Sequence, residues 1–216
     1  EALLRGLALI VGGDEDGGAA RLGEAVSLAG VELPAGSRAA AVVDTARLLR
    51  AMLRGRHADL AGARRDLDAL ARRAPDDPLV AYHRLVVDRT EATARGRIAA
   101  GTEDAPALAA ARASLDAVAE RARALADRPD LAWAGPALLA AEIDLERGES
   151  TAVLGRLNAA AVRFPEVPAV RRGKAAVYQA MSLSGGERTT LLREAQRELT
   201  EARRVDPRDP RTALDL

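Results

Sequence analysis

A glycine-bounded acidic loop near the start of the chain is the first stretch whose side chains could bind a metal ion. It runs Gly12-Gly-Asp-Glu-Asp-Gly-Gly18, and carboxylate oxygens are preferred ligands of Ca²⁺. The spacing differs from that of an EF-hand, because the glycine comes too early and Ala25 stands where the closing glutamate belongs. A solvated turn explains the loop better, since acidic side chains are favoured near the start of a following helix.

A second glycine turn, Leu183-Ser-Gly-Gly-Glu-Arg188, resembles the signature loop of ABC-type ATPases. In that loop, backbone amides and a serine at a helix start hold a nucleotide phosphate. Such ATPases also need a G-x-x-x-x-G-K-[ST] loop. The single lysine, Lys174, is followed by alanine, and Pro168 stands where the first glycine of that loop belongs. A turn between two paired helices therefore accounts for the segment without a nucleotide.

The remaining residues able to do chemistry are few and scattered. His57 and His83 are the two histidines, and neither has a second histidine at the helical spacing of a metal pair. We expect His57 at the start of a helix and His83 on a partly exposed face. The absence of cysteine excludes disulfides, thiol chemistry and cysteine-ligated metals. We therefore predict a non-enzyme with no catalytic residues, no metal site and no cofactor.

Composition and charge exclude further classes of protein. Charged residues make up 30% of the chain and sum to a formal net charge of zero, whereas proteins that bind nucleic acid usually carry a basic surplus. No apolar run reaches membrane-spanning length. Aromatic residues make up 2%, while alanine, the best helix former, is abundant. The composition favours an all-helical protein that neither binds nucleic acid nor inserts into a membrane.

Prolines that follow alanine-rich segments divide the chain into helices. Proline cannot continue a helix, but it suits the first turn of a new one. Apolar residues recur at helical spacing between these stops, which predicts ten helices in about five hairpins. Weaker stops occur at Pro34 and Pro129. The stronger stops carry a second proline three residues later, and they are Pro75 with Pro78, Pro165 with Pro168, and Pro207 with Pro210.

The fourth hairpin, residues 137–164, resembles a tetratricopeptide (TPR) repeat. That family pairs two helices that cross at small residues, with a glycine at the first turn and a proline after the second helix. The match is degenerate, because the closing prolines lie 41, 54, 36 and 42 residues apart along the chain, compared with 34 in the family. The matching residues are Ala140, Ala141, Gly148, Ala160 and Pro165.

The resemblance implies an all-α fold, specifically an α-solenoid of about five antiparallel helical hairpins that forms a right-handed superhelix. We expect residues 1–216 to form a single TPR-like domain within a longer chain. A compact all-helical bundle is the alternative architecture.

In TPR proteins a concave groove, lined mainly by the first helix of each pair, provides the binding surface. The resemblance therefore implies a non-enzymatic interaction module that binds a protein or peptide partner. Arginines would pair with carboxylates of the partner, and Tyr82 or Leu145 would make apolar contacts. The groove residues expected by repeat position and chemistry are Arg47, Tyr82, Arg89, Glu142, Leu145, Arg172 and Gln179.

Two other functions stay open at this point. One is a sensor or scaffold domain of a multidomain bacterial regulator, which would bind a small ligand or a neighbouring domain. The other is self-association through a terminal repeat, since a solenoid cut between repeats leaves an apolar face uncapped. The compartment stays open as well: a cytoplasmic location is slightly favoured, and an envelope location would require that a signal had been trimmed.

Overall fold

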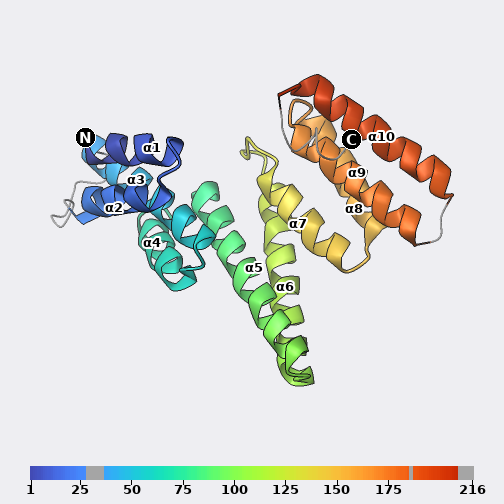
Figure 1. Cartoon of the computed structure of the whole chain (residues 1–216), viewed down its shortest axis with the longest axis horizontal. Coiled ribbons are helices and arrows are strands. Elements are labelled where there is room, and N and C mark those ends of the chain that lie inside the picture. The colour runs from blue at the N-terminus through green and yellow to red at the C-terminus, as the bar shows by residue number, and fades with distance from the viewer. Residues whose placement is uncertain (28–36, 185–186, 209–216) are drawn as a thin grey trace. The chain divides into compact units, whose positions relative to one another are not determined.

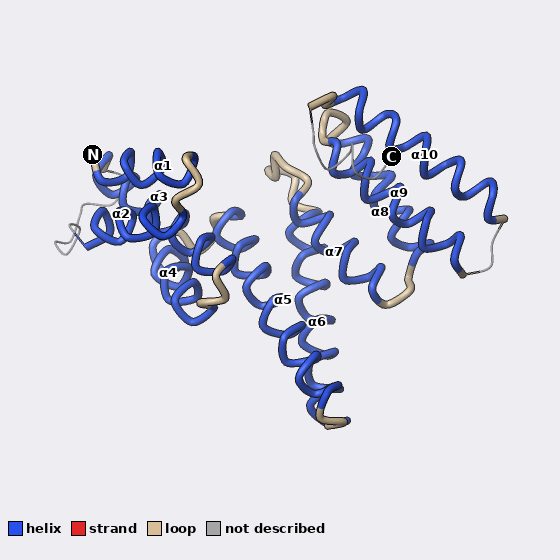
Figure 2. The backbone as a smooth tube through the Cα atoms, viewed as in Figure 1, coloured by secondary structure: helices blue, strands red, loops and turns tan. Residues whose placement is uncertain are grey.

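The computed structural model describes residues 1–27, 37–184 and 187–208, and every regular element within these ranges is an α-helix (Figure 2). The predicted all-helical class is therefore confirmed. The expected stops at Pro34 and Pro210 lie outside the described residues. The described helices, labelled in Figure 1, are α1 (Ala2–Val11), α2 (Glu15–Ser27), α3 (Arg38–Arg56), α4 (Leu60–Arg73), α5 (Pro78–Gly101), α6 (Ala105–Ala126), α7 (Gly135–Glu146), α8 (Ser150–Arg163), α9 (Pro168–Leu183) and α10 (Arg188–Val205).

Local sequence signals explain where several helices begin. Ser37, Asp59, Asp77 and Asp104 precede α3, α4, α5 and α6, and each side chain accepts a hydrogen bond from a backbone N–H in the first turn. These N–H groups have no partner within the helix, so a capping oxygen stabilises the helix start. Proline occupies the first turn of α5, α6, α7 and α9. Two predicted stops work as expected: Pro75 and Pro165 directly follow the C-caps of α4 and α8, and Pro78 and Pro168 start α5 and α9.

The chain divides into two compact units, residues 1–103 and residues 104–216. In the first unit, each helix from α1 to α5 packs against the next helix along the chain. In the second unit, the same holds from α6 to α10. The predicted third hairpin would pair α5 of the first unit with α6 of the second, so this pairing and the single domain over residues 1–216 stay predictions.

Buried alanines occupy the predicted helix crossings. Ala140, Ala141 and Ala160 of the fourth hairpin are 1%, 5% and 6% exposed. Ala63 in α4 and Ala195 in α10 are buried in the same way. Small side chains let two helix axes approach closely, and a larger residue would force them apart. Leucine and valine side chains then complete a set of small apolar clusters along each unit.

The turns after α3 and α7 share one backbone conformation. Ala58 and Gly148 have positive φ angles of 62° and 80°. In each turn the N–H of the following residue reaches back to a carbonyl in the last turn of the helix, from Asp59 to Arg54 over 2.8 Å and from Glu149 to Asp144 over 3.1 Å. This is the pattern of a Schellman motif, which favours glycine because a Cβ is strained at positive φ. Ala58 therefore occupies a position that suits glycine.

Replacing Ala58 by glycine should relieve this strain. We expect Ala58→Gly to raise the free energy of unfolding by roughly 0.5–1 kcal/mol, measured by urea denaturation. Ala94→Gly is the matched control, because Ala94 is exposed within α5 and glycine in a helix interior costs about 1 kcal/mol. A loss of stability in Ala58→Gly similar to that of the control would contradict the assignment of the turn.

Candidate functional site

Three of the predicted groove residues lie in the first unit. Arg47 lies on α3, and Tyr82 and Arg89 lie on α5. These helices are the first members of the second and third predicted pairs, and they contact one another. All three residues are half-buried, and the Tyr82 ring meets the His83 ring edge to face with centroids 5.2 Å apart. Arg47 makes no hydrogen bond or ion pair with the described part of the chain.

The other four predicted groove residues lie in the second unit. Glu142 and Leu145 lie on α7, Arg172 and Gln179 lie on α9, and these two helices are in contact. Glu142 and Gln179 are exposed, while Arg172 is half-buried. Leu145 packs against the apolar cluster that contains Leu157, so part of its surface serves the core. A shared groove role for the residues of either unit stays a prediction.

Three carboxylates are the most deeply buried charged groups among the described residues, and the sequence analysis did not identify them. Asp66, Asp144 and Glu198 are 5%, 0% and 2% exposed. Burying a carboxylate is costly unless it is paired and hydrogen-bonded. Each of the three contacts at least two cationic side chains, which satisfies this requirement.

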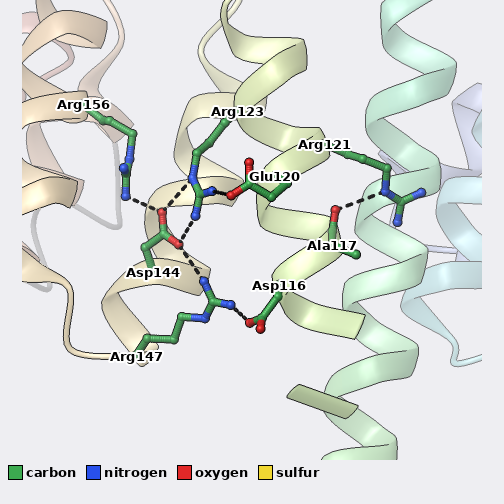
Figure 3. Close-up of polar contacts among 8 residues, drawn as sticks. All are labelled: Asp116, Ala117, Glu120, Arg121, Arg123, Asp144, Arg147 and Arg156. Carbon is green, nitrogen blue, oxygen red and sulfur yellow. Dashed lines mark hydrogen bonds and ion pairs between the residues drawn. The ribbon is translucent and has the colours of Figure 1, made fainter. Parts of the chain in front are cut away.

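Asp144 on α7 lies at the centre of the largest of these clusters (Figure 3). Its carboxylate accepts two hydrogen bonds from Arg123 of α6, with Nη2–Oδ1 and Nε–Oδ2 distances of 2.7 and 3.3 Å. Arg147, just after α7, donates to Oδ1 over 3.3 Å, and Arg156 of α8 donates to Oδ2. One buried side chain therefore links α6, α7 and α8.

Two acidic side chains of α6 complete the charge balance of this cluster. Glu120 contacts Arg123, and Asp116 contacts Arg147 (Figure 3). Three guanidinium groups thus face three carboxylates. The hydrogen bond to Asp144 is the main reason that the pKa of Arg123 is raised. The cluster is neutral as a whole, which lowers the cost of burying its central charge.

Asp66 on α4 is held by two arginines of α3. Arg50 donates through Nε to Oδ2 over 2.8 Å and through Nη2 to Oδ1 over 2.5 Å. Arg54 donates through Nη1 to Oδ2 over 2.9 Å. A bidentate arginine–carboxylate pair fixes orientation as well as distance, so this contact sets how α3 and α4 pack against each other.

Glu198 on α10 is held in the same way by two cations of α9. Arg171 donates through Nη1 to Oε2 over 3.0 Å, and Lys174 donates to Oε1. Lys174 is itself buried, with 7% of its surface exposed. The lysine that was considered for a phosphate loop is therefore engaged in a buried ion pair between paired helices.

One sequence position connects the three clusters. Asp66, Arg156 and Glu198 each lie nine residues before the proline that closes their hairpin, and each is followed by a buried leucine. In the pairs α3–α4 and α9–α10, the second helix carries the acid. In the pair α7–α8 the order is reversed: α8 carries Arg156, and the acid, Asp144, lies on α7. A charged residue directly before a core leucine was the signal that could have found these pairs.

The expectation that His57 lies at the start of a helix is wrong: His57 is the C-cap of α3. Its Nε2 atom lies 2.9 Å from Oε2 of Glu15, at the start of α2. This hydrogen bond is the largest cause of the lowered pKa of Glu15. The acidic loop therefore supplies a contact to the end of α3.

The described residues hold no group of three or more histidine or acidic side chains placed to bind a metal ion. Among the helices in ranges 1–27, 37–184 and 187–208, none combines the length and apolar character needed to cross a membrane. Residues 185–186 of the second glycine turn lie outside the described residues.

Removing the central charge of the largest cluster should be costly, because three arginines would lose their shared partner. We expect Asp144→Asn to lower the free energy of unfolding by about 3 kcal/mol, measured by urea denaturation. Glu120→Gln is the control, because Glu120 also contacts Arg123 but its side chain is 75% exposed, and we expect a loss below about 1 kcal/mol. Equal effects of the two substitutions would contradict the role given to Asp144.

Burial lowers the pKa of His83 below its ordinary value of 6.5. As pH falls below about 6.5, the unfolded chain therefore takes up this proton before the folded chain does, and stability declines. We expect the free energy of unfolding of the wild type to fall more between pH 7 and pH 5 than that of His83→Gln. Parallel pH profiles of the two proteins would show that His83 is not desolvated in the folded state.

Comparison with known proteins identifies a solved structure with the same architecture. Neither a family model nor a curated protein sequence matches the chain. The crystal structure of TTC0263, a thermophilic TPR protein of Thermus thermophilus, superposes with a TM-score of 0.72. The alignment covers 99% of this chain and 94% of that protein at 16% sequence identity. At this identity the similarity establishes the fold alone, and the chain therefore has a TPR-like α-solenoid fold.

Proposed function

We propose that this protein is a non-enzymatic interaction module that binds a segment of a partner protein along its first helices. TPR-like folds generally serve as scaffolds for protein–protein interaction, and helical-repeat proteins bind partners on extended walls of neighbouring helices. The observation that carries the proposal is the direct contact of α3 with α5 in one unit and of α7 with α9 in the other. We call these two surfaces walls: one is formed by α3 and α5, and the other by α7 and α9. Both walls carry charged side chains that are exposed or half-buried.

A wall that is ordered before binding supports useful affinity, because the partner does not have to order it. The buried ion pairs provide this order: Asp66 fixes α3 against α4, and Glu198 fixes α9 against α10. Together with the Asp144 cluster, these pairs engage every buried charged side chain among the described residues. The outward-facing charges are then the groups that recognise a partner.

The chemistry of the wall in the first unit favours a partner segment that combines a carboxylate with an apolar side chain. Arg47 has an unengaged guanidinium within the described part of the chain, and arginine binds carboxylates in a bidentate geometry. Tyr82 adds a half-buried aromatic ring, and tyrosine is enriched among residues that dominate binding energy. In the second unit, Arg172 is the arginine that we propose for a carboxylate contact; it is half-buried and, unlike Arg47, already has an interaction within the chain.

Charge reversal on the first helices tests this proposal. We expect Arg47→Glu/Arg172→Glu to bind the partner captured from native lysate at least tenfold more weakly than the wild type, because two attractive contacts become repulsive. Arg65→Glu/Arg203→Glu is the matched control, since both arginines are exposed on second helices, α4 and α10. Far-ultraviolet circular dichroism should show equal helicity in all three proteins.

Affinity measured by titration with the purified partner decides between the outcomes. Loss of binding in the first-helix variant alone supports the proposed surface. Equal binding by all three proteins would place the interaction elsewhere. Loss in the control variant alone would move it to the second helices.

A further inference from the structure

A pocket of about 290 Å³ lies in the first unit between α3, α4 and α5. Ala51, Leu67 and Val87 line it and are buried, with 2%, 1% and 5% of their surfaces exposed. Met52 and Val86 are half-buried lining residues. All five side chains are apolar, so the pocket is suited to an apolar guest.

His83 is the polar group that distinguishes this pocket. It lines the pocket and is half-buried, and its imidazole makes no hydrogen bond with any described residue. The other polar lining side chains are engaged: Arg56 pairs with Glu15 over 3.2 Å, and Thr90 donates to a backbone carbonyl over 2.9 Å. Burial lowers the pKa of His83, so the neutral ring offers one donor and one acceptor nitrogen at pH 7.

The size of the pocket limits the ligand. A cavity of about 150 Å³ can bind benzene, and pockets for drug-sized molecules begin near roughly 300 Å³. A volume of about 290 Å³ therefore accommodates one or two rings or a branched chain of similar size. A charged ligand would lose its hydration against apolar walls without a free counter-ion among the described lining residues.

We propose that this pocket binds a small, uncharged, mainly apolar molecule with one hydroxyl group that hydrogen-bonds to His83. A hydroxyl can donate to the unprotonated ring nitrogen or accept from the protonated one, so it matches either tautomer of the imidazole. All residues that line the pocket lie between residues 51 and 90, and none of them is among the residues proposed above to contact a partner protein.

The test uses p-cresol as the probe and toluene as the matched compound without a hydroxyl, each titrated into the full chain. Binding is followed by NMR shifts of the Met52 and Val86 methyl groups and of the His83 ring. Gly55→Leu fills the pocket, because Gly55 lines it and a Cβ added there meets no atom within 4 Å. Gly155→Leu is the control, since Gly155 of α8 is equally open and lies in the other unit.

We expect the wild type and Gly155→Leu to bind p-cresol saturably and about fivefold more tightly than toluene, as one net hydrogen bond predicts. Gly55→Leu should bind p-cresol at least tenfold more weakly. His83→Leu, which leaves the pocket open, should bind both compounds alike. The proposal is overturned if the wild type shows no saturable shifts, if Gly55→Leu binds p-cresol as well as the wild type, or if His83→Leu retains the preference for p-cresol.

Discussion

Close helix packing at buried alanines is the constraint on which the rest of this structure depends. Each buried carboxylate lies three residues after such an alanine: Asp66 follows Ala63, Asp144 follows Ala141 and Glu198 follows Ala195. Residues three apart share a helix face, so the acid lies one turn from the closest approach of the helices. Water has little access there, so the carboxylate is stable only when it is paired with cations of the neighbouring helices.

The buried ion pairs determine which arginines remain without a described partner inside the protein. Arginines of α3, α6, α8 and α9 pair with buried acids, so part of the positive charge of the chain is engaged between packed helices. An arginine such as Arg47, which has no described partner, is then distinct from these structural arginines. The distinction separates side chains that hold the helices together from side chains that we propose to bind another molecule.

The sequence predicted the fold well, because its determinants are local. Proline stops, capping residues and alanine at the crossings each act within a few residues, and they produced the helices in the expected order. The ion pairs were missed because they join residues distant in sequence, such as Arg123 and Asp144, 21 positions apart. Ala58 was missed because alanine carries no signal for positive φ. The residues predicted to line a groove lie on α3, α5, α7 and α9, but repeat position alone cannot show which of them, like Leu145, also pack against the core.

Native-state hydrogen exchange of the wild-type chain tests most directly whether buried carboxylates organise the helices. Asp144 contacts arginines from α6, from the end of α7 and from α8, so these helices should open together. The amides of α6, α7 and α8 should then share one free energy of opening, because a common contact makes them a cooperative unit. Exchange of α6 at a much lower opening free energy than α7 and α8 would contradict this view and reduce the Asp144 cluster to a set of local surface contacts.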